Sequence, residues 1–209
     1  MRILACGRRH RAAGVLGCLL SVVLSGAAGA QTPTSRVRGA IDSFSGTELV
    51  VKSRTGENEK IVLPETARVA SVAKAALTDI KSGTFIGTAA MPIEGGTLRA
   101  LEVLIFPEAM RGTGEGHRPW DLLPESTMTN ATVAETVDKV DGPILNLTYN
   151  GGEKKVVVPP EAPIVTFAPA DRSDLKPGAR VIATVTKGPD GALTATSVVV
   201  GKNGVDPPM

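Results

Sequence analysis

The chain repeats itself, and this repeat limits the possible folds more than any other feature of the sequence. Residues 56–105 align without a gap to residues 151–200, at an offset of 95, and 14 of the 50 pairs are identical. Upstream, the offset changes to 96, which matches Ile41 with Val137. Similarity at one fixed spacing indicates a structural unit made twice. We therefore predict two tandem copies of one small domain.

Each copy has the pattern of an all-β domain. Apolar and polar residues alternate in the first segment, and glycine-containing turns separate the segments that follow, which is typical of half-buried strands joined by hairpins. Pro64 and Pro159 end the third strand of their copies, because proline has no N–H for the ladder. A fourth extended segment, a short helix or loop, and a final hairpin follow; the hairpins are predicted over residues 85–106 and 180–200.

This order predicts a mainly β protein with two five- to six-stranded OB-like β-barrels and a short helix or loop connector in each. A half-open sandwich is the competing architecture. The turn Asp-Leu-Lys-Pro-Gly at 174–178 and the hairpin at Asp190-Gly191 resemble a family of small OB-like domains found, often in tandem, in exported bacterial proteins. The resemblance covers residues 36–106 and 130–201 and implies the fold but no particular activity. Some similar proteins are called metal transporter permeases, a name that would require several membrane helices.

The first thirty residues predict export. Arginines open the segment, an apolar run follows, and Ala28-Gly29-Ala30 supplies the small residues of a cleavage site. A retained membrane anchor is the alternative, since the apolar run is about the ~20 residues that span a bilayer. Cleavage would leave a periplasmic or secreted protein without cysteine, because Cys6 and Cys18 both lie in this segment. Disulfides, thiolate catalysis and Cys-ligated zinc would then be excluded.

The repeat and the leader together set the predicted domain boundaries. They are a signal peptide over 1–30, a first repeat over 31–106, a structured linker over 107–131, a second repeat over 132–203 and a flexible tail over 204–209.

Charge argues against a nucleic-acid partner. The sequence has 23 Lys and Arg against 21 Asp and Glu, and four of the arginines lie in residues 1–30, which leaves 19 against 21, or −2. A protein that binds nucleic acid usually carries a basic face instead. After the leader, no apolar run predicts a membrane-spanning helix. The oligomeric state is left open.

Residues 107–131 have no counterpart in either repeat, and they contain the only tryptophan, Trp120. Their glycines and prolines predict a loop rather than a helix. One interpretation is a connector in which Trp120 buries its ring on a barrel surface and fixes the angle between the two copies. The other interpretation is a binding site, either for a ligand or, if only some of these residues take part, for a divalent metal. The ligand-site candidates are Glu115, His117, Arg118, Trp120 and Asp121, and the metal candidates are Glu115, His117 and Asp121.

The sequence favours a non-catalytic module that binds an envelope protein or another cell-surface component and needs no cofactor. The alternative is an accessory protein that binds a small molecule or a divalent metal through residues 107–131. A hydrolase with His117 as its base is disfavoured, because the sequence has no Gly-x-Ser-x-Gly elbow. Whether the two copies exchange strands is also left open.

Overall fold

The structure is a computed structural model that describes residues 33–139 and 142–207. The predicted signal peptide, residues 1–30, lies outside the described residues. The described chain is mainly β, with thirteen strands joined in one sheet and with four short 3-10 turns as its only helical elements. In this part of the chain, no helix is long and apolar enough to cross a membrane.

The strands follow the two predicted repeats. The first repeat contains β1 (Thr34–Phe44), β2 (Glu48–Ser53), β3 (Asn58–Val62), β4 (Arg68–Lys74), η1 (Leu77–Asp79), β5 (Phe85–Pro92), η2 (Glu94–Gly96) and β6 (Leu98–Ile105). The second repeat contains β8 (Thr127–Val137), β9 (Ile144–Tyr149), β10 (Gly152–Val157), β11 (Ile164–Ala168), η4 (Arg172–Asp174), β12 (Arg180–Lys187) and β13 (Leu193–Gly201). Between the repeats lie η3 (Glu108–Met110) and β7 (Gly116–Pro119).

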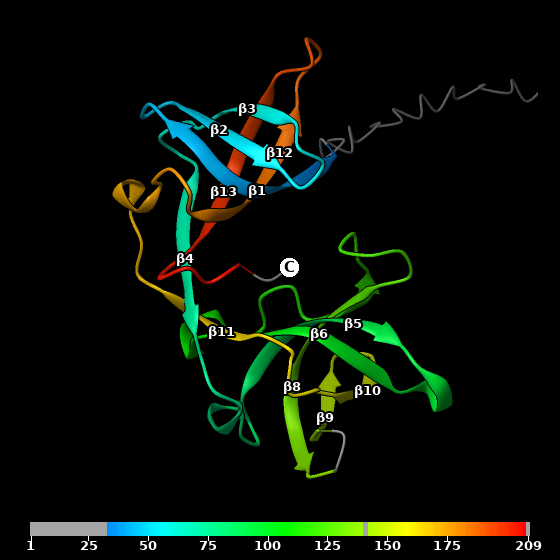
Figure 1. Ribbon diagram of the computed structural model, residues 1–209. Coiled ribbons are helices and arrows are strands. Elements are labelled where there is room, and N and C mark those ends of the chain that lie inside the picture. Colours follow the sequence, from blue (N-terminus) through cyan, green and yellow to red (C-terminus); the bar gives the residue numbers. More distant parts are fainter. Residues whose placement is uncertain (1–32, 140–141, 208–209) are drawn as a thin grey trace, which may run out of the picture. The chain divides into compact units, whose positions relative to one another are not determined.

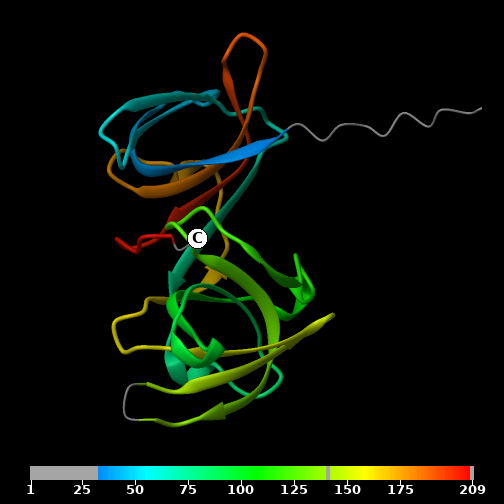
Figure 2. The same cartoon turned by 90° about the vertical axis from the view of Figure 1, so that its right-hand side faces the viewer.

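The strand pairing shows that the two repeats exchange their final hairpins. β1 pairs with β12 of the other repeat, and β8 pairs with β5. In the first strand group, the pairings run through β1, β2, β3, β13 and β12 and return to β1. In the second strand group, they run through β8, β9, β10, β6 and β5 and return to β8. Figure 1 and Figure 2 show the exchange as a mixture of early and late colours in the first strand group.

The hydrophobic cores follow the strand groups and not the repeats. In the first strand group, Leu49 and Ile61 of repeat 1 pack with Val198 of repeat 2. In the second strand group, Val103 of repeat 1 packs with Leu147 of repeat 2, and all five side chains are fully buried. Removal of apolar surface from water is the main favourable contribution to folding. Each repeat therefore depends on the other to bury its apolar faces.

β4 and β11 join the two strand groups into one sheet. β4 pairs with β13 and β11, and β11 pairs with β6. Beside this junction, the Phe106 ring packs 5.3 Å from the Phe85 ring and 5.7 Å from the Phe167 ring, measured between centroids. Such tilted aromatic contacts add to the burial of the rings. The junction is thus a packed part of the molecule.

The structure corrects the alignment of the first strands. Ile41 exchanges backbone hydrogen bonds with the turn before β12, and Val133 does the same with the turn before β5. Ile41 therefore corresponds to Val133, and its alignment with Val137 was wrong by four residues. The extra residues of repeat 2 lie between β8 and β9. A slip by an even number keeps every side chain on the same face of a strand, so alternation does not reveal it.

The predicted linker and tail contain more ordered structure than a loop. β7 pairs with β8 from Gly116 to Pro119, and β8 itself begins at Thr127, inside the predicted linker. In the tail, Val205 packs against the aromatic cluster, and Asp206 forms an ion pair with Arg180 at 3.0 Å. The described part of the tail is therefore attached to the sheet.

Candidate functional site

The five candidate residues of the linker lie at two different places. Asp121 contacts β1, where its carboxylate lies 2.8 Å from the Arg38 guanidinium. Glu115 and His117 contact the second strand group instead: Glu115 accepts the backbone N–H of Asn150 at 2.9 Å. Asp121 therefore has different partners from Glu115 and His117, although the sequence suggested that the three could bind one metal ion.

Two arginines lie near the Trp120 ring. The guanidinium carbon of Arg36 lies 3.8 Å from the centre of the Trp120 ring, and that of Arg118 lies 5.5 Å from it. Arg36 also bonds to Asp121 at 3.2 Å. A guanidinium over a tryptophan face contributes about 0.5–1 kcal/mol when exposed and about 2 kcal/mol when desolvated. We name this set the arginine–tryptophan cluster: Arg36, Arg38, Arg118, Trp120 and Asp121.

The cluster brings the Asp121 carboxylate close to the charged side chains of Arg36 and Arg38. Partial burial raises the pKa of Asp121, but the hydrogen bond from Arg38 and the charges of Arg36 and Arg38 outweigh it and hold the pKa below its ordinary value. Burial, followed by the charge of Arg36, lowers the pKa of Arg118. The side chain of Arg38 is only 10% exposed and that of Arg36 is 26% exposed. These charges are therefore less screened by water than ordinary surface charges.

A hollow of about 280 Å³ opens beside the cluster. Its walls come from β1, from the turn between β2 and β3, and from the linker. Three of its residues are arginines and two are acidic: Arg36, Arg38, Arg54, Glu59 and Asp121. The planar donors of arginine suit carboxylate and phosphate groups.

His117 makes a structural contact. Its Nδ1 atom shares a hydrogen bond of 2.8 Å with the hydroxyl of Thr129, and its ring stacks on Tyr149 with 6.4 Å between centroids. Burial, followed by the charges of Lys154 and Arg118, lowers the pKa of His117. Thr129 itself is fully buried.

The metal candidates do not converge. Glu115 bonds to a backbone N–H, His117 to a threonine, and Asp121 to two arginines. Across residues 33–139 and 142–207, no group of three or more His, Cys, Asp and Glu side chains is placed to hold a metal ion. The observed contacts instead resemble those of a connector fixed at both ends.

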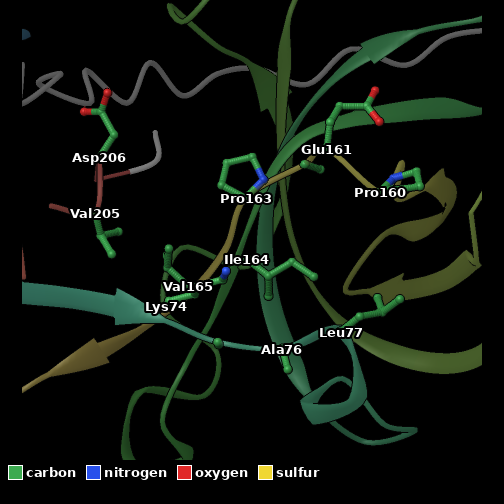
Figure 3. A pocket seen from close by; sticks show the side chains of 12 residues that line it. Lys74, Ala76, Leu77, Pro160, Glu161, Pro163, Ile164, Val165, Val205 and Asp206 are labelled. Carbon is green, nitrogen blue, oxygen red and sulfur yellow. The ribbon is translucent and has the colours of Figure 1, made fainter. Parts of the chain in front are cut away.

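A second hollow, of about 540 Å³, lies beside Leu77 and Ile164, near the start of η1 (Figure 3). Its volume is in the range of small-molecule pockets. Two of its charged side chains are taken by ion pairs, Glu161 with Arg99 at 2.7 Å and Asp206 with an arginine of β12. Most of the remaining wall is apolar, so this hollow offers little to orient a ligand.

Sequence reasoning found Trp120 and Asp121 but missed Arg36 and Arg38. The signal was present, because Arg36 and Arg38 flank one apolar residue and so share the outer face of a strand. Their partners lie more than eighty residues away along the chain, which no local pattern reveals. Comparison with family models, with curated proteins and with solved structures finds no match to this chain.

Proposed function

We propose that the chain is a non-catalytic, exported binding module of the bacterial envelope, and that the arginine–tryptophan cluster is its contact surface for a partner protein. The observation that carries this proposal is the contact of Arg36 of β1 and Arg118 of β7 with the Trp120 ring, beside the ion pair of Arg38 with Asp121. Tryptophan and arginine are enriched among the residues that contribute most to protein–protein binding. Export rests on the leader-like residues 1–30.

We also propose that each strand group is an OB-like barrel. The support is the circuit of five pairings in each group, which returns to its starting strand. Such a scaffold supports β1 through its pairing with β12 over Thr34–Ala40 and with β2 from Gly39 onwards. A surface on rigid strands loses little conformational entropy on binding.

The charge of the cluster suggests the chemistry of the partner. The guanidinium groups of Arg36 and Arg118 lie over the Trp120 ring, and Arg54 lines the hollow beside it. Carboxylates of a partner would therefore be attracted, and mobile salt would weaken the contact. A metal-binding role has less support, because the side chains proposed as ligands have other partners.

Chemical cross-linking in envelope extracts tests this function. The wild-type chain is compared with Trp120→Ala and Arg118→Glu, and with Lys187→Glu as a matched control on an exposed hairpin end. We expect one set of partners to be captured by the wild type and the control and lost by both cluster variants. Equal capture by all four proteins would contradict the proposal.

A thermal-shift series with divalent cations tests the alternative. Stabilisation by one cation that is lost in His117→Ala would favour a metal-binding accessory protein, since binding to the folded state alone raises the melting temperature.

A further inference from the structure

We propose that β1 carries a strand-addition site, where an extended, acidic segment of a partner protein pairs with the open edge of residues 35–38. The inference rests on the proposed binding function and specifies the form and charge of the partner. It uses the backbone beside the arginine–tryptophan cluster as well as its side chains.

The precedent for this pairing lies within the chain. Over Thr127–Asn130, β8 is flanked on one edge by β5 and on the other by β7. Because Ile41 corresponds to Val133, residues 35–38 of β1 correspond to residues 127–130 of β8. In the first strand group, β12 takes the position of β5. Within the described residues, no strand pairs with the other edge of β1 at this stretch, where the counterpart of β7 would lie.

The direction of the backbone groups follows from two hydrogen bonds. On the β12 side, Ile41 donates its N–H to the carbonyl of Ala179 at 2.9 Å. On the β2 side, the carbonyl of Arg38 accepts the N–H of Arg54 at 3.2 Å. Successive residues of a strand point their backbone groups to opposite edges, so Thr34 and Arg36 direct theirs to the same side as Arg38. Thr34 and Arg36 precede Gly39, the first residue of β1 that pairs with β2. An open edge of this kind is a template for another strand.

Space and charge at this edge match an acidic strand. The hollow of about 280 Å³ lies between this stretch of β1 and the turn that carries Arg54. In the second strand group, Glu115 directly precedes β7 and accepts the backbone N–H of Asn150, the counterpart of Arg54. In the first strand group the backbone N–H of Arg54 already donates to the carbonyl of Arg38, so an acidic residue at the equivalent place would be available to the Arg54 side chain, which lines the hollow. A guanidinium binds such a carboxylate through two parallel hydrogen bonds.

The contact is short, so the expected affinity is modest. β7 covers four residues of β8, and an added strand of the same length would make only a few backbone hydrogen bonds. Each such bond strengthens binding by about twofold to tenfold. Specific recognition therefore needs both the backbone pairing and the charged side chains, and the test must separate them.

The probe is a capped hexapeptide of alternating glutamate and valine. Two analogues accompany it: one has lysine in place of glutamate, and the other carries N-methyl groups that remove the backbone donors. Binding is followed by the fluorescence of Trp120, the only tryptophan, and by NMR shifts of the Arg36 and Arg54 amides. We expect the glutamate peptide to bind about tenfold more tightly than either analogue, because each analogue loses one of the two kinds of contact.

Two variants locate the site. Thr34→Pro removes one donor on the open side, at the first residue of β1, where proline is tolerated. It should weaken binding of the glutamate peptide several-fold. Arg54→Glu should reverse the preference between the glutamate and lysine peptides, and Lys187→Glu should change neither.

The possible outcomes are distinct. Equal binding of all three peptides, shifts confined to other strands, or no binding at millimolar concentration would overturn the proposal. A wild-type dimer that Thr34→Pro disrupts would overturn it as well, because a second copy would then be the occupant. If cross-linking still depends on Trp120, the proposed function survives and only the strand-addition site falls; if it does not, both fall.

Discussion

Arg172 should stabilise the first strand group more than its place in a short surface turn suggests. Its guanidinium donates hydrogen bonds to the carbonyl of Gly46 at 2.8 Å, to that of Leu63 at 3.3 Å and to that of Pro64. Leu63 is fully buried. Since η4 belongs to repeat 2 and these carbonyls to repeat 1, the contact ties one repeat to the other.

The perturbation is Arg172→Met, which keeps an apolar stem and removes all three donors. A hydrogen bond from a charged group contributes about 1.5–3 kcal/mol, and a buried carbonyl left without a partner costs about 1–3 kcal/mol. The three do not add in full, because the carbonyl of Pro64 also accepts the N–H of Ala67 at 3.0 Å and one bond is long. We expect a loss of about 3 kcal/mol, which lowers the melting temperature by about 6–12 °C in a chain of this size.

The reciprocal variant is Leu77→Arg. Position 77 of repeat 1 corresponds to position 172, and there Leu77 is 38% exposed. The equivalent turn of the second strand group has the same backbone pattern: Val158 donates its N–H to the carbonyl of Pro143, as Leu63 donates to that of Thr47. Leu77→Arg should therefore find the carbonyls that follow β10 and stabilise the chain by about 1 kcal/mol.

Urea unfolding followed by circular dichroism measures both changes. The free energies are comparable if the slope with urea is the same in all variants. A loss below about 1 kcal/mol in Arg172→Met, together with no gain in Leu77→Arg, would refute the view that this guanidinium stabilises the group through the carbonyls.

Three further predictions follow from the fold and the cluster. A protease site inserted after the exposed Leu123 should give, on cleavage, two fragments that co-elute in native buffer and separate only in urea, because each fragment supplies strands to both groups; separate native peaks would contradict the exchange. Trp120→Ala should lower the free energy of unfolding by about 2 kcal/mol through the lost stacking on Arg36 and the lost burial of the ring, and an unchanged urea midpoint would show that the ring contributes nothing. The lowered pKa of His117 means that its unfolded form binds a proton more readily, so the stability it contributes is present above pH 6.5 and is lost as the pH falls. Urea midpoints between pH 7 and pH 5 should fall less steeply in His117→Gln than in the wild type.

The strands themselves were largely predictable from the sequence. The predicted final hairpins at residues 85–106 and 180–200 agree closely with β5–β6 and β12–β13. Prolines and glycines mark the turns, and both act locally, through the lost N–H and through positive φ angles such as that of Gly178. What depends on a residue and its near neighbours can be read from the sequence.

The exchange of hairpins was not predictable. β5 and β12 carry similar apolar patterns, so either hairpin would fit beside β1 as far as alternation is concerned. The choice depends on the path of β4 and β11, which pair with each other and lead each chain segment to the opposite group. Repeats with similar sequences make intact and exchanged arrangements difficult to tell apart by pattern alone.

The candidate site was only half predictable. Trp120 stood out because it is unique in the sequence, whereas Arg36 and Arg38 looked like ordinary surface residues of a strand. Grouping Asp121 with Glu115 and His117 assumed that a short segment stays together in space. β7 instead holds His117 beside β8, whereas Asp121, further along the chain, contacts Arg38 of β1.

The exchanged hairpins also set the order in which the chain can mature. The strands β1, β2 and β3 can pair with one another, but β1 lacks its neighbour β12 and β3 lacks its neighbour β13 until residues 180–201 have been synthesised. Contacts so distant along the chain form late and slowly. The first strand group of the nascent polypeptide therefore stays incomplete until the last two strands have been made, whereas the second group has all its strands once residue 157 has been added.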